Sequence, residues 1–335
     1  MKGIGKATCI IAATLCVAAV SCRTTGNGDT QTEKMSGSVI KSPATFDSDS
    51  AYAYVARQVA MGPRIPGTRA NAECAEYIRT ELMRHGADTV TEQRATVTAY
   101  NGDRLPINNL MGRFNTEAPA RILLVAHYDT RPWADSDPEQ INHLEPVPGA
   151  NDGASGVGVI LEIARHLSVN KPAIGVDMLL VDAEDYGQSS GFSNHDETWA
   201  LGTQYWTEHM PYTQDNMPRY AILLDMVGGI DAKFHREYFS NNYARNIVDK
   251  VWGIAARSGY SDRFVNLDGG AVVDDHLYLN RAGIPAIDII ESKNEVTKSF
   301  SPTWHTVDDN MDNIDRSSLK AAGQTVLNVI YNESI

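Results

Sequence analysis

The sequence has little cysteine, a deficit of basic residues and no apolar run long enough for a comfortable membrane span. Only four of its 335 residues are cysteine, namely Cys9, Cys16, Cys22 and Cys74, which excludes a disulfide-dense scaffold. The chain has 29 Lys and Arg against 42 Asp and Glu, a formal net charge of −13. This balance argues against a large basic surface for nucleic acid. The 42% hydrophobic and 21% charged residues are typical of a folded globular protein.

The N-terminus has the pattern of an export signal. Lys2 and Lys6 precede an apolar run over residues 7–20, which ends at Ser21 and Cys22. The run is too short to span a membrane, so residues 1–21 are predicted to be a cleaved secretory signal peptide. Cys22 after Ala-Val-Ser resembles a bacterial lipoprotein processing site. We therefore expect an exported bacterial protein, periplasmic or anchored to a membrane only through lipid on Cys22; ordinary cleavage without lipid is the alternative.

The segment after the signal differs in composition from the rest of the chain. Residues 22–45 are polar and lack apolar periodicity, so we predict a flexible tether. Residues 46–335 contain no internal repeat and no linker-like stretch, and we interpret them as one α/β domain. If Cys22 is acylated, Cys74 is left without a partner, and the fold depends on its hydrophobic core.

Apolar runs of strand length alternate with helical patterns in this domain. Buried strands are predicted at residues 121–126, 176–181, 220–224 and 284–290, and an antiparallel edge strand at residues 89–99. Helices are predicted around residues 72–84, ending near Gly86, and around residues 159–167 and 319–330. This order predicts a three-layer α/β sandwich with a central mixed, mostly parallel β-sheet flanked by helices.

Acids and histidines follow the predicted strands. They are His127 and Asp129 after the first buried strand, Glu184 and Asp185 after the second, Asp225 after the third, His305 beyond the fourth, and Asp152 before a helix. One acid in such a place is often a cap or turn residue. Together they form one candidate site, because ligands of open α/β sheets bind beyond the carboxyl ends of the strands. Imidazole and carboxylate donors without thiolate suit Zn²⁺ in an open catalytic site.

Glu184 is adjacent to a candidate ligand, Asp185. Neighbouring residues at a strand end point in different directions, so one can hold metal while the other faces substrate. We predict that Glu184 is a general acid and base. The alternative is a carboxylate that orients a metal ligand.

Five motifs occur in order along residues 50–335. They are His127-Tyr-Asp, Asn151-Asp-Gly-Ala-Ser-Gly, Glu184-Asp, Asp225-Met-Val-Gly and His305-Thr. Each is weak alone, but their order after the predicted strands resembles the zinc aminopeptidase superfamily. Asp274-Asp-His, Trp304-His-Thr and the Asp at 185 are similar to the glutaminyl cyclase branch of that superfamily.

The resemblance implies an activity and a role for each residue. A glutaminyl-peptide cyclotransferase converts the N-terminal glutamine of peptides or proteins to pyroglutamate and releases ammonia. The resemblance implies that Asp152, Asp185 and His305 bind one zinc ion per chain and that Glu184 transfers protons. It also implies that Asp225 and Asp274 form an acidic hydrogen-bond network beside Glu184, and that Trp304 lines the substrate pocket. The order of residues in the resemblance alone favours Asp274 over Asp275.

Two other functions stay open at this point. In the aminopeptidases of the superfamily, the positions of His127 and Asp225 hold a second zinc. The sequence is therefore also compatible with a dizinc aminopeptidase. His127 and Asp129 are candidates either for binding a second metal or for supporting the ligands of the first. A binding protein on an inactive scaffold is the third hypothesis. The polar segment 186–199 is predicted either to overhang the site or to be a surface loop without a role.

Overall fold

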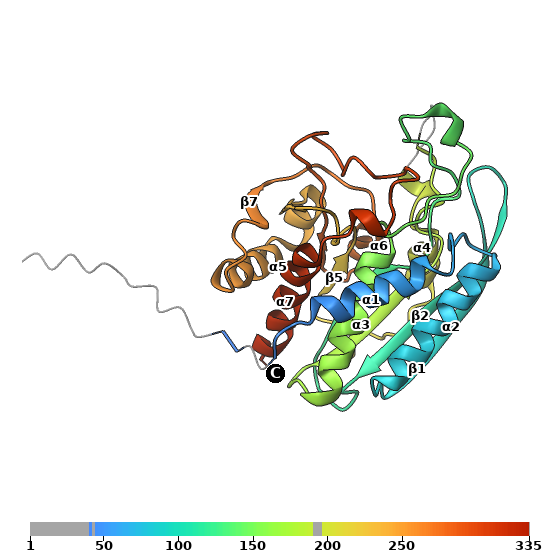
Figure 1. Cartoon of the computed structure of the whole chain (residues 1–335). Helices are drawn as coiled ribbons and strands as arrows, with labels where there is room; N and C mark the ends of the chain where they lie inside the picture. The colour runs from blue at the N-terminus through green and yellow to red at the C-terminus, as the bar shows by residue number, and fades with distance from the viewer. Residues whose placement is uncertain (1–39, 42–43, 190–195, 335) are drawn as a thin grey trace, which may run out of the picture. The chain divides into compact units, whose positions relative to one another are not determined.

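The computed structural model describes residues 40–41, 44–189 and 196–334 (Figure 1). The predicted signal peptide and most of the predicted tether lie outside the described residues, as does the middle of segment 186–199. No helix in the described ranges is both long and apolar enough to cross a membrane.

A six-stranded sheet with the order β1-β2-β4-β3-β5-β8 forms the centre of the fold. Its strands are β1 (Thr89–Thr98), β2 (Arg104–Phe114), β3 (Arg121–His127), β4 (Gly175–Val181), β5 (Ala221–Leu224) and β8 (Ala286–Ile289). Strands β4, β3, β5 and β8 are mutually parallel, while β1 and β2 form an antiparallel hairpin whose β2 joins β4. The predicted mixed, mostly parallel sheet is confirmed. Two short parallel strands, β6 (Phe234–Arg236) and β7 (Phe264–Asp268), form a separate sheet that the sequence did not suggest.

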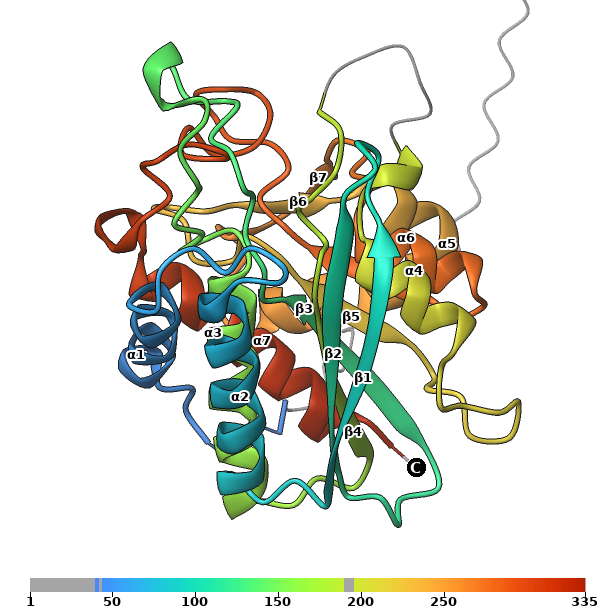
Figure 2. The ribbon, with the colours of Figure 1, turned by 90° about the vertical axis from the view of Figure 1, so that its right-hand side faces the viewer.

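Helices cover both faces of the sheet (Figure 2). They are α1 (Ser48–Val59), α2 (Arg69–Arg84), α3 (Ala154–Val169), α4 (Leu201–Glu208), α5 (Tyr238–Arg257), α6 (Asp275–Arg281) and α7 (Arg316–Asn332), with short 3-10 turns at Gln140–Asn142, Asp196–Thr198 and Met311–Asn313. Helices α1, α2, α3 and α7 lie on one side, and α4 and α6 lie on the other. Helix α5 packs along β8 and contacts both α6 and α7.

The central strands alternate their side chains between the two layers. In β3, Ile122 and Leu124 pack into the larger core with α3 and α7, whereas Leu123 and Val125 pack toward α4 and α6. Every residue of β3 and β4 is buried. Burial on both faces explains why these strands are continuous apolar runs in the sequence.

Side-chain caps fix where several helices begin. The side chains of Asp47, Thr68, Glu237, Asp274 and Asp315 accept hydrogen bonds from backbone N–H groups in the first turns of α1, α2, α5, α6 and α7. The end of α2 matches its prediction, because Gly86 follows the helix with a φ of 74°.

The start of α3 lies against the ends of β3 and β5. A Cβ on Gly156 would lie 2.0 Å from the carbonyl oxygen of Leu224. A Cβ on Gly153, whose φ is 93°, would lie 2.7 Å from the carbonyl oxygen of Asp129. Only glycine allows this approach without a backbone shift, and the approach carries Asp152 to the end of β3.

We expect Gly156→Ala to lower the free energy of unfolding by about 1–3 kcal/mol, because the added methyl group forces α3 away from β5. Chemical denaturation measures this change. Gly253→Ala is the matched control, since its Cβ would meet only the flexible end of Arg257 at 3.3 Å. That substitution should be neutral or stabilising by up to about 1 kcal/mol, as for other helix-interior glycines. Equal losses in both variants would contradict close packing at Gly156.

Candidate active site

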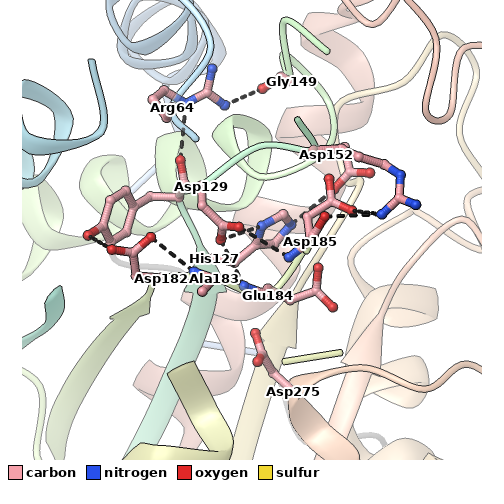
Figure 3. A network of polar contacts seen from close by, with 12 residues as sticks. Arg64, His127, Asp129, Gly149, Asp152, Asp182, Ala183, Glu184, Asp185 and Asp275 are labelled. Atoms are coloured by element: carbon pink, nitrogen blue, oxygen red, sulfur yellow. Dashed lines mark hydrogen bonds and ion pairs between the residues drawn. The ribbon is translucent and has the colours of Figure 1, made fainter. Parts of the chain in front are cut away.

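The carboxyl ends of four parallel strands supply the candidate site. His127 is the last residue of β3, and Asp225 directly follows β5. Glu184 and Asp185 lie in the turn after β4, and His305 comes from the loop that follows β8. Asp152 lies just before α3, and Figure 3 shows it close to His127, Glu184 and Asp185. Ion-pair distances place Asp225 beside His127, and His305 beside Asp152 and Asp185, so the predicted residues do meet at one edge of the sheet.

His127 lies at the centre of one group of possible ligands. Its Nε2 atom lies 3.0 Å from Asp152 Oδ1 and forms a 3.2 Å hydrogen bond with Asp225 Oδ1. Its Nδ1 atom lies 3.4 Å from Asp129 Oδ1. Burial favours the neutral ring, but these three carboxylates outweigh burial and raise the pKa of His127 well above its ordinary value.

A second group shares Asp152 with the first. His305 Nε2 lies 3.0 Å from Asp185 Oδ1 and 3.6 Å from Asp152 Oδ2. One ligand atom from each of Asp152, Asp185 and His305 lies within 4.8 Å of the other two. No described group makes a hydrogen bond to either carboxylate oxygen of Asp185, despite the nearby imidazole nitrogen. Possible ligand atoms that lie close together without a hydrogen bond between them leave room for a shared cation. Two carboxylates and one imidazole are ligands that suit zinc.

Asp129 positions the turn that carries Glu184 and Asp185. Its two carboxylate oxygens accept hydrogen bonds from the backbone N–H groups of Glu184, at 3.0 Å, and Asp185, at 3.1 Å. Ala183, just before these residues, has a left-handed φ of 53°, and His305 has a φ of 54°. Non-glycine residues adopt this conformation only when the surroundings hold them there, and such residues cluster at functional sites.

Asp309 positions the turn that carries Asp152 in the same way. It accepts hydrogen bonds from the backbone N–H groups of Asn151, at 2.7 Å, and Asp152, at 3.0 Å. The Asn151 side chain in turn accepts a 2.8 Å hydrogen bond from the backbone of Gly228, in the turn after β5. Sequence reasoning assigned no role to Asp309, although it lies within the motif that begins at Trp304.

The acids beside the second group are protonated more readily than exposed acids. Burial, and then the charge of Asp274, raises the pKa of Glu184 well above its ordinary value. Burial and the charge of Asp225 raise the pKa of Asp274 to about 7. Burial and the charge of Asp152 raise the pKa of Asp225 to about 6. These acids can therefore share protons near neutral pH.

Asp274 and Asp275 differ in access to the site. Asp274 lines the cavity described below, whereas Asp275 is fully buried and does not line it. Burial and the neighbouring Asp274 raise the pKa of Asp275 to about 8. Of the two residues, Asp274, the one chosen from the sequence, is the one that lines the cavity.

A cavity of about 270 Å³ opens over the second group. Its acidic side contains Asp152, Glu184, Asp185, Asp225 and Asp274, and its apolar side contains Trp199, Met226, Val272, Ile290, Phe300 and Trp304. The Trp304 ring stacks on His305 at a centroid distance of 3.7 Å, and Phe300 lies 4.7 Å from Trp304. The cavity is slightly smaller than pockets for drug-sized ligands, so it suits one residue of a peptide.

Several wall residues were not identified from the sequence. Trp199 lines the cavity and stacks on His305 at 6.0 Å, and Gln188 and Ser189 line it as well. The described ends of segment 186–199 therefore reach the site, whereas residues 190–195 lie outside the described residues. A single aromatic residue in a polar loop does not indicate from the sequence whether it lines a cavity or belongs to a surface loop.

We expect Asp185→Ala to lose bound metal, because it removes one of the three side chains whose ligand atoms lie within 4.8 Å of one another. Metal analysis of the purified variant should show little zinc, compared with a stoichiometric amount in the parent protein. Asp308→Ala is the control, since Asp308 lies only three residues after His305 in the sequence but is exposed. Stoichiometric zinc in the Asp185 variant would refute its role as a ligand.

Comparisons with known proteins agree with this geometry. The chain is 48% identical to Bacteroides thetaiotaomicron glutaminyl cyclase, with a TM-score of 0.83, covering 87% of this chain and 99% of that one. It is 47% identical to a leucine aminopeptidase precursor from the same organism, with a TM-score of 0.83, covering 88% of this chain and all of that one. Bos taurus glutaminyl-peptide cyclotransferase is 24% identical over 282 residues, which are 76% of this chain and 74% of that protein.

A family model covers the same part of the chain. The model of peptidase family M28 matches residues 109–330, from the middle of β2 to the last turns of α7. This range includes all the residues of both candidate ligand groups. The chain therefore belongs to peptidase family M28.

Proposed function

We propose that the protein is a zinc-dependent glutaminyl-peptide cyclotransferase that acts on peptides and proteins with N-terminal glutamine. The observation that carries the proposal is the cavity, where the buried Glu184, the Asp152–Asp185–His305 group and the flat Trp304 wall meet in a space for one residue. Relatives with the corresponding names, from B. thetaiotaomicron and Bos taurus, support it.

We assign one zinc ion per chain to Asp152, Asp185 and His305. The cavity supports this choice, because all three of these residues line it, whereas His127 of the other group does not. His127 and Asp129 then support the ligands. Zinc on these residues would act as a Lewis acid on the γ-carbonyl of the glutamine.

In the proposed reaction the α-ammonium group of the bound glutamine first loses one proton to solvent, and the resulting α-amine attacks the γ-carbonyl carbon of the same residue. A ring C–N bond forms, the bond to the amide nitrogen breaks, and ammonia leaves. Glu184 accepts the proton that the attacking amine loses and gives it to the leaving nitrogen. Its raised pKa suits this exchange, because the carboxyl group must be able to hold the proton.

Asp274 and Asp225 complete the acidic side of the cavity. Asp274 faces the ligand space, and the shared protons of Glu184, Asp274 and Asp225 keep this buried group from carrying three full charges. Their remaining negative charge favours a substrate with a free α-ammonium group. Trp304 forms a rigid wall that limits the conformations of the glutamine side chain, and an intramolecular reaction gains most from such restriction.

A dizinc aminopeptidase is the second candidate. The observation that favours it is the first group, His127, Asp152 and Asp225, which also places three ligand atoms within 4.8 Å of one another. The relative named as a leucine aminopeptidase precursor adds to it. In that reaction Glu184 would activate water in place of a substrate amine.

Product analysis distinguishes the two functions. A peptide with N-terminal glutamine should lose the mass of one ammonia and stay otherwise intact, with equimolar ammonia in solution. The peptide with N-terminal glutamate in place of glutamine is the substrate control, because it has no amide nitrogen to release. Free glutamine and a shortened peptide would instead establish an aminopeptidase.

Glu184→Gln is the variant control for this assay. It keeps the size of the side chain but cannot exchange the proton, so turnover should fall by roughly 10²–10⁴-fold. Zinc content should stay at the parent level, because Glu184 belongs to neither ligand group. Parent-level turnover in this variant would remove Glu184 from the mechanism.

For localisation we propose export and anchoring through lipid on Cys22, on the basis of the N-terminal sequence pattern. Cell fractionation after expression in a bacterium tests this proposal. The full chain should be found with membranes, and Cys22→Ala should move it to the soluble exported fraction. Cys74→Ala is the cysteine control and should leave the distribution unchanged. Membrane association that survives Cys22→Ala would contradict the anchor.

A further inference from the structure

A fully buried guanidinium group lies behind the proposed metal ligands. Arg131, four residues after the end of β3, has an exposed fraction of 0%. Its Nη1 atom lies 3.6 Å from Asp185 Oδ1 and donates hydrogen bonds to the carbonyl oxygens of Asp185, at 3.1 Å, and Gly187, at 3.2 Å. The guanidinium group therefore holds both the carboxylate and the backbone of one proposed ligand.

Arg131 reaches a second proposed ligand through Asp135. Its Nε and Nη2 atoms donate to the two carboxylate oxygens of Asp135 at 2.7 and 2.6 Å, a bidentate pair. Asp135 Oδ1 lies 3.6 Å from Nδ1 of His305, on the side of the ring opposite the proposed metal. The two atoms make no hydrogen bond at this distance, but a carboxylate beside the second nitrogen of a ligating imidazole favours one orientation of the ring.

The same guanidinium group supports one wall of the cavity. Its central carbon lies 5.0 Å from the ring centroid of Trp199 and 5.2 Å from that of Trp133. Trp199 packs so closely on Gly187 that a Cβ on this glycine would lie 2.0 Å from the Trp199 ring. Arg131 thus fixes the backbone under Trp199 as well as the ring itself.

The stability of the fold alone does not account for this arrangement. A buried ion pair costs desolvation free energy, and an apolar replacement of similar volume is often as stable. A planar guanidinium group at this place instead fixes the positions of the groups around it, because its five N–H donors point in fixed directions. The carboxylate of Asp135 and the backbone carbonyl oxygens of Asp185 and Gly187 accept from these donors.

We propose that Arg131 is a positioning residue that fixes Asp185, His305 and the Trp199 wall as one unit. Its action on His305 passes through Asp135, and its action on Trp199 passes partly through Gly187. The proposal rests on the proposed zinc site, but it concerns the affinity of that site and does not depend on which reaction follows.

The test is Arg131→Lys, which keeps the charge but loses the planar fork. Zinc affinity is measured by competition with a chromophoric chelator, without substrate and well below the melting temperature. We expect binding to weaken by roughly 10–100-fold, the range for partners of metal ligands. If the parent protein turns over a glutamine peptide, KM should rise as well, because the Trp199 wall loosens.

Arg121→Lys is the matched control, at the first residue of β3. Arg121 is also buried and also makes a bidentate pair, with Asp177 at 2.8 and 2.5 Å. Both substitutions therefore carry a similar cost in stability, but only the one at Arg131 faces the site. Zinc affinity at the parent level in Arg131→Lys, with a melting temperature lowered as in the control, would overturn the proposal.

Asp135→Asn keeps the test decisive if Arg131→Lys does not fold. Asp135 is partly exposed, with 21% of its side chain accessible, so the fold should tolerate the change. Zinc affinity should fall, and unchanged affinity would overturn the path through Asp135. A parent protein that binds zinc but forms no pyroglutamate would disprove the proposed function and leave this measurement intact.

Discussion

The structure depends on a concentration of negative charge where four parallel strands end. Asp152, Glu184, Asp185, Asp225 and Asp274 all line one small cavity, and none is more than a few per cent exposed. Ionised carboxylates so close together, and removed from water, would destabilise the fold by many kcal/mol. Compensation takes three forms here, namely shared protons, the imidazole rings of His127 and His305, and the buried guanidinium group of Arg131. A zinc ion would be the fourth.

A second set of carboxylates holds the backbone and leaves the ligand space free. Asp129 binds the N–H groups of Glu184 and Asp185, and Asp309 binds those of Asn151 and Asp152. These bonds restrain short turns that contain left-handed residues, so the turns keep one conformation while their side chains face the cavity. The backbone of these turns is therefore held by bonds that involve no ligand, which is the kind of support that a precisely positioned site needs.

Local signals predicted much of this arrangement. Continuous apolar runs gave the four buried strands, and the acids and histidines that follow them gave the candidate ligands, because chain direction in a parallel sheet decides where those residues meet. The choice of Asp152, Asp185 and His305 among these candidates came from the family resemblance. Other features depend on contacts between distant segments. In the sequence Asp309 is indistinguishable from a turn residue, and only the fold brings it to the backbone of Asn151. Likewise, Trp199 is a single aromatic residue in a polar loop, and only the fold stacks it on His305. The small β6–β7 sheet escaped prediction because its strands are too short to show a period.

The same charge that strains the site can select its substrate. An α-ammonium group that enters the cavity brings a cation to Asp274 and Glu184, and an internal glutamine cannot supply it. A cyclase and an aminopeptidase need this recognition equally, which is why one architecture can serve both. The difference lies in the nucleophile, the substrate's own amine or a water molecule. Trp304, Phe300 and Ile290 give the cavity an apolar wall. Such a wall favours attack from within the substrate where it holds the glutamine side chain folded back toward its own amine.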